Sequence, residues 1–225
     1  MLKFQTVNKA FGKNKVLKGI DIAIEGGEFV SFIGPSGVGK STIIHLLLGA
    51  DTVDSGEIWV DQYQISKLKP VELQNYRRKI GVIFQDYKLL PNKTVYENIA
   101  YALEVTGYDD KYINEKVTDA LTLVGLKRKA NAMPHTLSGG EKQRTALARA
   151  IIHKPRLILA DEPTGNLDPK GTDDLIDLLL KINKSGTTIV LATHNDRIVD
   201  KIKKRVIHLE DGKVVSDKAQ AGYYN

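Results

Sequence analysis

The sequence predicts an α/β fold whose core is a doubly wound parallel sheet, with an N-terminal antiparallel β lobe and an inserted α-helical lobe. Continuous apolar runs, typical of parallel strands that are buried on both faces, are separated by stretches with helical periodicity. Short segments of alternating apolar and polar residues gather near the N-terminus and are typical of antiparallel strands. The chain has 225 residues, the size of one such domain with a smaller lobe inserted.

The antiparallel lobe is expected at the start of the chain. Leu2, Phe4 and Val7 alternate with polar residues, as in a strand with one buried face. Residues 16–24 and 56–60 also have strand character and are bounded by glycine-containing turns. Together these segments suggest an antiparallel β lobe.

The parallel core is expected to follow four apolar runs, at residues 29–34, 80–85, 157–161 and 188–194. A mostly helical stretch at 94–124 lies between the second and third runs and predicts the inserted lobe. Asp211-Gly212 joins two short apolar segments near the C-terminus and predicts a hairpin. We treat residues 1–225 as a single domain, with the β lobe and first part of the core at 1–90, the helical lobe at 91–150 and the rest of the core at 151–225.

Composition excludes several classes of protein. The sequence has no cysteine, so disulfide and thiolate chemistry are excluded, and no apolar run long enough to cross a bilayer. The N-terminus does not resemble a signal peptide, and we expect a cytoplasmic protein. The formal net charge is +6, with one dense basic cluster at Lys201, Lys203, Lys204 and Arg205. A cluster this short is more typical of a solvated helix end than of a binding patch, and no nucleic-acid partner is expected.

The most informative motif fits the pattern G-x-x-x-x-G-K-[ST] and lies between an expected strand and an expected helix. Its residues are Gly34, Pro35, Ser36, Gly37, Val38, Gly39, Lys40 and Ser41, and Thr42 follows at the start of the helix. Backbone N–H groups in such a loop and the helix dipole create a phosphate-binding concavity. The alternative is a glycine-rich turn that binds nothing. We expect Lys40 to face solvent until it reaches the β- and γ-phosphates, and Ser41 to hold Mg²⁺.

Two acids follow the apolar run at 157–161. An acid at the end of such a strand holds Mg²⁺ in enzymes with this phosphate loop, and Asp161 occupies that place. Glu162 comes next and can orient a water and accept its proton. The alternative is that Glu162 only caps the turn at Pro163.

A second anion site is indicated by Ser138, Gly139 and Gly140. Ser138 and Glu141 have the spacing of a capping box for the helix that follows, through Ile152. Exposed N–H groups at the start of that helix can also bind an anion. Two phosphate-type sites about one hundred residues apart suggest a dimer in which one copy's phosphate loop faces the other copy's Ser138.

Taken together, these motifs resemble those of the ABC-type ATPases, and the resemblance covers almost the whole chain. Residues 137–141, followed by Gln143 and Arg144, are similar to the signature motif of that family. The order of phosphate loop, signature and acidic strand is also the same. The resemblance implies a RecA-like P-loop NTPase core, ATP hydrolysis with Mg²⁺, and a homodimer that forms on ATP binding.

The resemblance also assigns roles to residues that spacing alone leaves open. It implies that Gln85 contacts Mg²⁺ and senses the partner, and that His194 contacts the γ-phosphate. Phe11 occupies the place of an aromatic residue that stacks on adenine, and residues 165–168 match the loop that crosses the dimer interface. Asn195 differs from the aspartate that is common after the histidine.

Finer motifs resemble those of the bacterial cell-division group within the family. The resemblance implies an FtsX-like membrane subunit as partner, regulation of cell-wall hydrolases, and a peripheral location on the inner face of the plasma membrane. ATPases of lipoprotein release and macrolide export share most of these residues and remain an alternative. So does a nucleic-acid-associated ABC ATPase, although such proteins usually need further domains. A GTPase is disfavoured because no Asn-Lys-x-Asp motif is present.

A cluster of apolar and aromatic residues follows Gln85 in the sequence. Its members are Tyr87, Leu89, Leu90, Val95 and Tyr96. About half of them are expected to belong to the core of the helical lobe. The others are expected to line a groove for a helix of the membrane partner.

Overall fold

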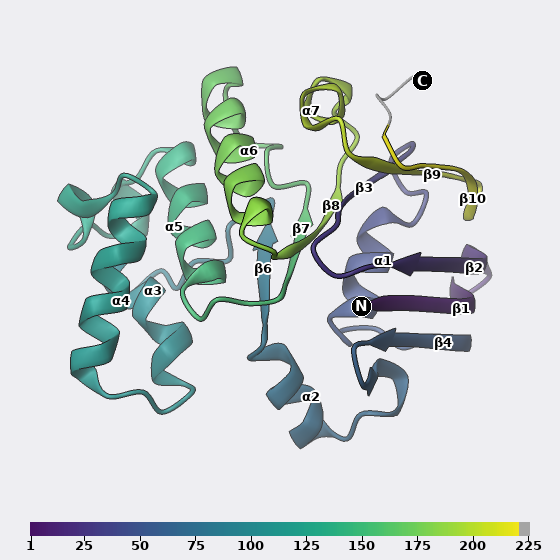
Figure 1. The fold of residues 1–225 in the computed structure, drawn as a ribbon, viewed down its shortest axis with the longest axis horizontal. Helices are drawn as coiled ribbons and strands as arrows, with labels where there is room; N and C mark the ends of the chain where they lie inside the picture. The colour runs from purple at the N-terminus through teal and green to yellow at the C-terminus, as the bar shows by residue number, and fades with distance from the viewer. Residues whose placement is uncertain (221–225) are drawn as a thin grey trace.

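The computed structural model describes residues 1–220, which form two sheets flanked by helices (Figure 1). The smaller sheet is antiparallel in the order β2-β1-β4-β5, with strands Leu2–Phe11 (β1), Asn14–Ile24 (β2), Ser55–Val60 (β4) and Tyr63–Gln64 (β5). Leu2, Phe4 and Val7 of β1 are buried while their neighbours are more exposed, as the alternation predicts.

The larger sheet has the order β10-β9-β3-β8-β7-β6. Five of its strands are parallel, and only the hairpin strand β10 runs antiparallel. The strands are Phe29–Ile33 (β3), Ile80–Phe84 (β6), Leu157–Asp161 (β7), Thr188–Ala192 (β8), Arg205–Glu210 (β9) and Lys213–Lys218 (β10). All four expected core strands and the C-terminal hairpin are therefore confirmed. The ends of β3, β6 and β8 fall one or two residues before the expected ends, where the chain turns into the loops described below.

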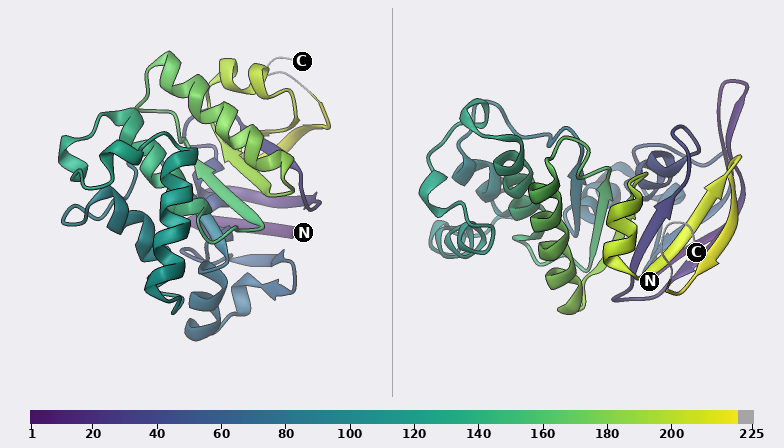
Figure 2. Two further views of the ribbon diagram at one scale, coloured as in Figure 1. Left: turned by 60° about the vertical axis from the view of Figure 1, so that its left-hand side comes forward. Right: turned by 90° about the horizontal axis from the view of Figure 1, so that it is seen from above.

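Helices cover the larger sheet and form the inserted lobe. They are Lys40–Leu47 (α1), Pro70–Arg77 (α2), Val95–Glu104 (α3), Asp110–Leu123 (α4), Gly139–Ile151 (α5), Pro169–Lys184 (α6) and Asp196–Ile202 (α7). Both views in Figure 2 keep α3, α4 and α5 on one side of the molecule and the antiparallel sheet on the other. The inserted helical lobe is thus confirmed, whereas its outer limits at residues 91 and 150 stay a prediction. None of the helices in residues 1–220 is long and apolar enough to cross a membrane.

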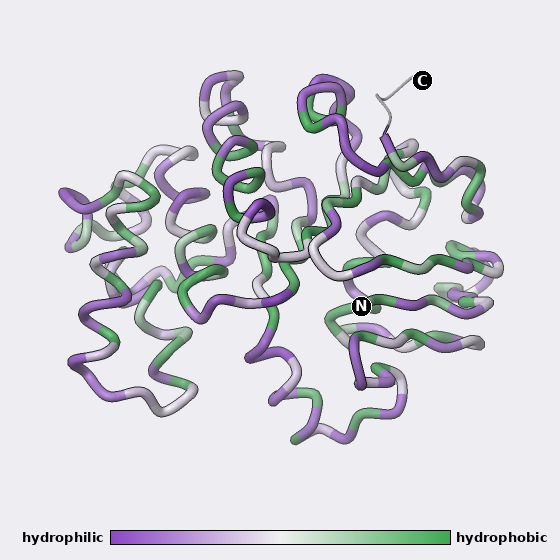
Figure 3. The backbone as a smooth tube through the Cα atoms, viewed as in Figure 1, coloured by the Kyte–Doolittle hydropathy of each residue, from purple (hydrophilic) through white to green (hydrophobic). Residues whose placement is uncertain are grey.

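The two faces of the larger sheet belong to two hydrophobic clusters. Ile158 and Ala160 of β7 pack with the helical lobe and α6, whereas Leu157 and Leu159 pack with α1 and the antiparallel sheet. This alternation within one short strand follows from the two-residue repeat of side chains along a strand. Figure 3 shows the hydrophobic stretches along the central strands. Both faces of the sheet are therefore covered by packed side chains.

Candidate functional site

The candidate site lies where adjacent parallel strands end. The strand register pairs Phe84 with Asp161 and Asp161 with Ala192, so the residues that follow β6, β7 and β8 emerge side by side. The phosphate loop follows β3, which pairs with β8. Ligands of open α/β sheets bind at this edge, the carboxyl ends of the strands. The topology thus brings the residues that follow four strands, far apart in the sequence, to one place.

The phosphate loop has a backbone that requires glycine at two points. Gly34 has φ 138°, and a Cβ there would lie 2.2 Å from the Leu209 carbonyl oxygen. Gly39 has φ 113°, and a Cβ there would lie 2.6 Å from the Leu17 side chain. Helix α1 then begins without a side-chain cap and without an acidic residue in its first turn. Its free N–H groups and its dipole favour an anion at this end.

Lys40 is buried inside this loop, which corrects our expectation of a solvent-facing side chain. Its Nζ donates hydrogen bonds to the carbonyl oxygens of Gly34 at 2.8 Å and Pro35 at 3.0 Å, and the residue is 6% exposed. Burial lowers the pKa of Lys40, while the charges of Glu162 and Asp161 oppose that shift. The lysine therefore links two carbonyls of its own loop.

Ser41 and Asp161 meet across the site. The Ser41 hydroxyl donates to Oδ1 of Asp161 at 2.9 Å. Burial raises the pKa of Asp161, and the hydrogen bond from Ser41 partly opposes this. A hydroxyl and a carboxylate are oxygen ligands that Mg²⁺ accepts, together with phosphate and water. Within residues 1–220 no group of three or more His, Cys, Asp or Glu side chains forms a complete metal cage. The pair therefore fits Mg²⁺ that arrives with a phosphate better than it fits a permanently bound metal.

Asp161→Asn is expected to stabilise the nucleotide-free protein while lowering Mg²⁺-dependent hydrolysis. Because its folded-state pKa is raised, ionised Asp161 opposes folding at all pH values above its unfolded pKa, and asparagine removes that cost. We expect the melting temperature at pH 7.5 to rise. The difference should shrink as the pH falls through the raised pKa of Asp161, because the wild-type carboxyl is then neutral as well. Thermal unfolding followed by circular dichroism across this range tests the prediction, and an unchanged or lower melting temperature at pH 7.5 would contradict it.

Glu162 has a strained backbone and a fixed carboxylate. Its φ is 44°, in the left-handed region that residues with a Cβ seldom adopt. Its N–H donates to the Ala192 carbonyl at 2.9 Å, which holds the residue at the end of β8. The carboxylate accepts from the Thr193 hydroxyl at 3.3 Å and lies 2.7 Å from Nδ1 of His194. An ionised carboxylate at this distance favours the tautomer in which Nδ1 carries the proton.

The structure thus joins Glu162 and His194, two residues to which the sequence analysis assigned separate roles. Thr193 was not singled out at all. No sequence signal could have found these contacts, because they depend on the register of β7 against β8. The sequence analysis also gave Gln143 no structural contact. Its buried side-chain amide donates to the Pro163 carbonyl at 2.5 Å and so holds the residue after Glu162.

Ser138 caps helix α5 as the spacing predicts. Its N–H donates to Glu141 Oε2 at 2.9 Å, and its Oγ accepts from the Glu141 N–H at 3.2 Å. The hydrogen bond from Ser138 lowers the pKa of Glu141, and the charge of Lys129 adds to this effect. Ser138 is exposed, and in the described part of the chain no hydrogen bond joins residues 138–140 to the phosphate loop. This end of α5 is therefore open to a group from outside the chain.

Gln85 and the loop at 165–168 touch each other. Asn166 Nδ2 donates to the Gln85 carbonyl at 3.0 Å, and a Cβ on Gly165 would lie 2.6 Å from the Gln85 side-chain nitrogen. Gln85 itself is exposed and follows Phe84, the register partner of Asp161. The backbone of Gln85 therefore lies one residue beyond the register partner of Asp161 and its side chain packs against Gly165, and no hydrogen bond joins Gln85 to Asp161 among the described residues.

Phe11 lies at the end of β1 with 49% of its surface exposed. The Lys9 ammonium lies 5.0 Å from the centre of its ring. The hairpin leads into Val16 and Leu17, which contact the Gly39 position of the phosphate loop. An exposed aromatic face close to that loop is suited to stacking on a planar ring.

The basic cluster at the end of α7 is largely neutralised. Lys201 forms an ion pair with Asp177 at 2.8 Å, and Arg205 pairs with Glu28 at 2.8 Å and with Asp217 at 2.7 Å. Lys203 and Lys204 are exposed and form no ion pair among residues 1–220. The cluster is therefore the solvated end of α7 together with an arginine that links β9 to β10, as expected of so short a cluster.

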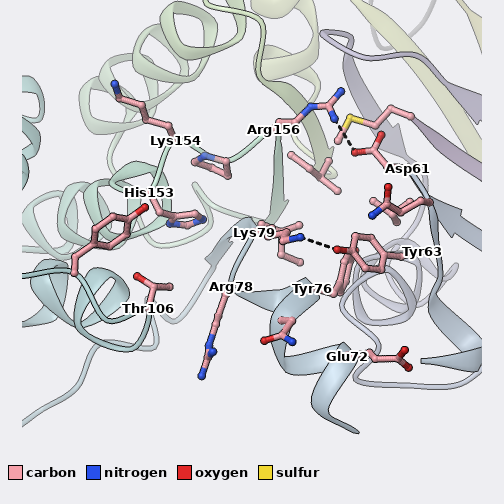
Figure 4. Close-up of a pocket in the computed structure, with 18 residues that line it drawn as sticks. Asp61, Tyr63, Glu72, Tyr76, Arg78, Lys79, Thr106, His153, Lys154 and Arg156 are labelled. Atoms are coloured by element: carbon pink, nitrogen blue, oxygen red, sulfur yellow. Dashed lines mark hydrogen bonds and ion pairs between the residues drawn. The ribbon is translucent and has the colours of Figure 1, made fainter. Parts of the chain in front are cut away.

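A separate cavity of about 810 Å³ lies at the opposite end of the larger sheet, where Ile80 and Leu157 begin β6 and β7 (Figure 4). Its charged groups do not converge. Lys79 donates to the Tyr63 hydroxyl at 2.7 Å and Arg156 pairs with Asp61 at 3.1 Å, whereas Arg78 and Lys154 extend in different directions. We assign no ligand to this cavity.

Comparison with known proteins agrees with the motifs and the fold. A model of the ABC transporter family matches residues 17–165. The chain is 48% identical to the cell division ATP-binding protein FtsE of Streptococcus pneumoniae, covering 96% of this chain and 94% of that protein. It is 50% identical to the protein of the same name from Mycobacterium tuberculosis, covering 92% and 90%. Among solved structures, a dimeric post-hydrolysis state of the ATP-binding cassette MJ0796 bound to ADP and Pi superimposes with a TM-score of 0.90. It is 36% identical and covers 99% of this chain and 100% of its own.

Proposed function

The chain belongs to the ABC transporter family and is an ABC ATPase, and we propose that it drives the membrane partner of an FtsE-like cell-division system. The observation that carries the proposal is the convergence of Lys40, Ser41, Asp161 and Glu162 at one edge of the sheet. The cell-division role is supported by relatives of that name at 48% and 50% identity over nearly the whole chain.

We propose that residues 34–42 bind the phosphates of ATP. The free N–H groups at the start of α1 face the anion, and Lys40 exchanges its two loop carbonyls for phosphate oxygens. Phe11 stacks on the adenine ring. Ser41, Asp161 and Gln85 are assigned to Mg²⁺, which when bound would neutralise charge on the phosphate oxygens.

Glu162 is proposed as the general base. Its carboxylate is held by the Thr193 hydroxyl and by His194, and its strained backbone fixes the direction of the side chain. From this position it orients a water for attack in line with the bond to the leaving group and accepts the water's proton at a carboxylate oxygen. His194 lies beside it and is assigned to the γ-phosphate.

We propose that the site is completed by a second copy of the chain. Ser138 is exposed at the start of α5, and among residues 1–220 no hydrogen bond joins residues 138–140 to the phosphate loop of the same chain. The N–H groups there suit the γ-phosphate held by the other copy. The solved dimer of MJ0796, with a TM-score of 0.90 to this chain, supports this arrangement.

An FtsX-like membrane subunit is proposed to dock on the exposed parts of residues 87–96, which would place the protein on the inner face of the plasma membrane. Val95 is fully buried and belongs to the core of the helical lobe. Leu89, Leu90 and Tyr96 are half-buried and available at the surface. Asn98 fixes this segment, because it accepts from the Leu90 N–H at 2.8 Å and donates to the Leu90 carbonyl at 3.1 Å.

Leu90→Glu is expected to release the protein from membranes and to cause a division defect. A charge placed among apolar anchors of an interface commonly costs about 2 kcal/mol or more. ATP binding by the released protein should persist, because no phosphate-binding residue changes. Co-purification of the membrane subunit with detergent-solubilised protein measures the effect.

Leu123→Glu on α4 is the matched control, since this leucine is 39% exposed and lies outside the proposed surface. The control should keep the membrane subunit. Retention of the subunit by Leu90→Glu and by Tyr96→Glu would move the docking surface away from residues 87–96.

A further inference from the structure

Arg149, near the C-terminal end of α5, reaches across to the segment that follows Gln85. Its guanidinium donates to the carbonyl oxygens of Lys88 at 2.7 Å and Tyr87 at 3.0 Å. Burial lowers the pKa of Arg149, and within residues 1–220 no carboxylate forms an ion pair with it. The half-buried guanidinium therefore donates to two adjacent backbone carbonyls of one turn and to no carboxylate among the described residues.

Both residues that Arg149 contacts have left-handed backbones. Tyr87 has φ 62° and Lys88 has φ 45°. Two successive left-handed residues that carry a Cβ are sterically unfavourable. Arg149 fixes both carbonyls and thereby compensates for this strain. Local hydrogen bonds, from the Tyr87 N–H to the Phe84 carbonyl at 3.2 Å and from the Lys88 N–H to the Asp86 carbonyl at 2.7 Å, also shape this turn, and Arg149 ties it to α5.

Tyr87 also contacts the other end of the same helix. Its hydroxyl lies 3.1 Å from the Cβ position of Gly139, the first residue of α5, and the Asn166 carbonyl lies equally close to that position. Burial raises the pKa of the Tyr87 hydroxyl. Asn166 in turn donates to the Gln85 carbonyl. Gln85, the start of α5 and the loop at 165–168 thus form one connected set of contacts.

We propose that Arg149 is a positioning residue that holds the left-handed turn at Tyr87 and Lys88 and thereby places Gln85 beside Asp161. This inference rests on the proposed role of Gln85 at the Mg²⁺ site. Arg149 touches neither the phosphate loop nor Asp161 in the described contacts, so its loss should leave ATP binding nearly intact. Turnover should fall, because the turn relaxes and Gln85 leaves the acidic strand end.

The test compares Arg149→Gln and Arg149→Lys with Arg77→Gln in steady-state ATPase assays of the purified protein. Arg77 is a matched control, since it donates in the same way to the carbonyls of Leu48 and Gly49, both at 2.9 Å, and has no described hydrogen bond to Gln85 or to the turn after it. Arg149→Gln should lower kcat by about tenfold or more with KM for ATP changed less than about threefold. Arg149→Lys should recover part of kcat. Arg77→Gln should lower the melting temperature without changing kcat.

Hydrogen exchange provides the local readout. Exchange of the amides at 85–90 should increase in Arg149→Gln, while the amides of α5 stay protected. Wild-type kcat in Arg149→Gln, or an equal loss of kcat in Arg77→Gln, would overturn the inference. If Arg149→Gln fails to fold, the same kcat and hydrogen-exchange measurements on Arg149→Lys test the inference.

Gln85→Ala separates this inference from the function on which it rests. If Gln85→Ala lowers kcat and Arg149→Gln does not, only the positioning role of Arg149 fails. If Gln85→Ala retains wild-type kcat, the role of Gln85 at the Mg²⁺ site fails, and the inference fails with it.

Discussion

Glu162→Gln is expected to slow ATP hydrolysis by about 10² to 10⁴, the usual loss when a general base is removed. Glutamine has the same shape and can still accept a hydrogen bond from Thr193, but it cannot take a proton from water. The contact between Glu162 and His194 at 2.7 Å adds a second consequence. In the variant the negative charge that strengthens the hydrogen bond between residue 162 and His194 is lost, so the His194 imidazole should become more mobile.

Single-turnover measurements with saturating Mg²⁺-ATP separate the chemical step from binding. ATP affinity should stay within a few-fold of wild type, because the phosphate loop is untouched. Thr193→Val is a useful companion, since it removes one hydrogen bond to Glu162 while keeping the base, and a smaller loss is expected. Turnover by Glu162→Gln at the wild-type rate would exclude Glu162 as the base.

Lys40→Ala is expected to abolish measurable ATP binding. The lysine is the only cation that the described structure places inside the phosphate loop, and its ammonium would face two or three phosphate charges. Its burial changes what we expect of stability. The variant loses the hydrogen bonds to the Gly34 and Pro35 carbonyls but also the cost of burying the ammonium, which lowers the pKa of Lys40, so the free energy of unfolding should change by less than about 1 kcal/mol.

Isothermal titration with Mg²⁺-ATP measures the binding, and chemical denaturation without nucleotide measures the stability. Lys13→Ala, at the exposed tip of the hairpin between β1 and β2, is the matched control and should bind ATP normally. Full ATP affinity in Lys40→Ala would refute the assignment of residues 34–42 to phosphate binding.

Much of this architecture could be predicted from local pattern. The run at 29–33 is apolar almost throughout and is buried at every position, because a parallel central strand is covered on both faces. Ser138 and Glu141 form the capping box that their spacing predicts, since such a motif depends only on residues three apart. Helix α2, by contrast, was not anticipated, because residues 70–77 have few apolar side chains and only Tyr76 among them is buried.

What could not be predicted depends on contacts between distant segments. The burial of Lys40 follows from how the loop closes over its own carbonyls, and the link from Glu162 to His194 follows from strand register. Arg149 lies in a helix whose periodicity was clear, yet its partners at Tyr87 and Lys88 are about sixty residues away. The sequence shows which side chains are available, whereas the tertiary fold determines which of them come into contact.

The central claim is that two copies of the chain close around ATP, with Ser138 of each copy facing the phosphate loop of the other. Light scattering on Glu162→Gln during size exclusion tests this claim most directly, because ATP stays intact in that variant. With Mg²⁺-ATP the molar mass should double from the 24.9 kDa of the single chain, and it should return to the single-chain value with ADP. Adding Ser138→Arg to Glu162→Gln should prevent the doubling while ATP still binds. A single-chain mass for Glu162→Gln at saturating Mg²⁺-ATP would contradict the shared site.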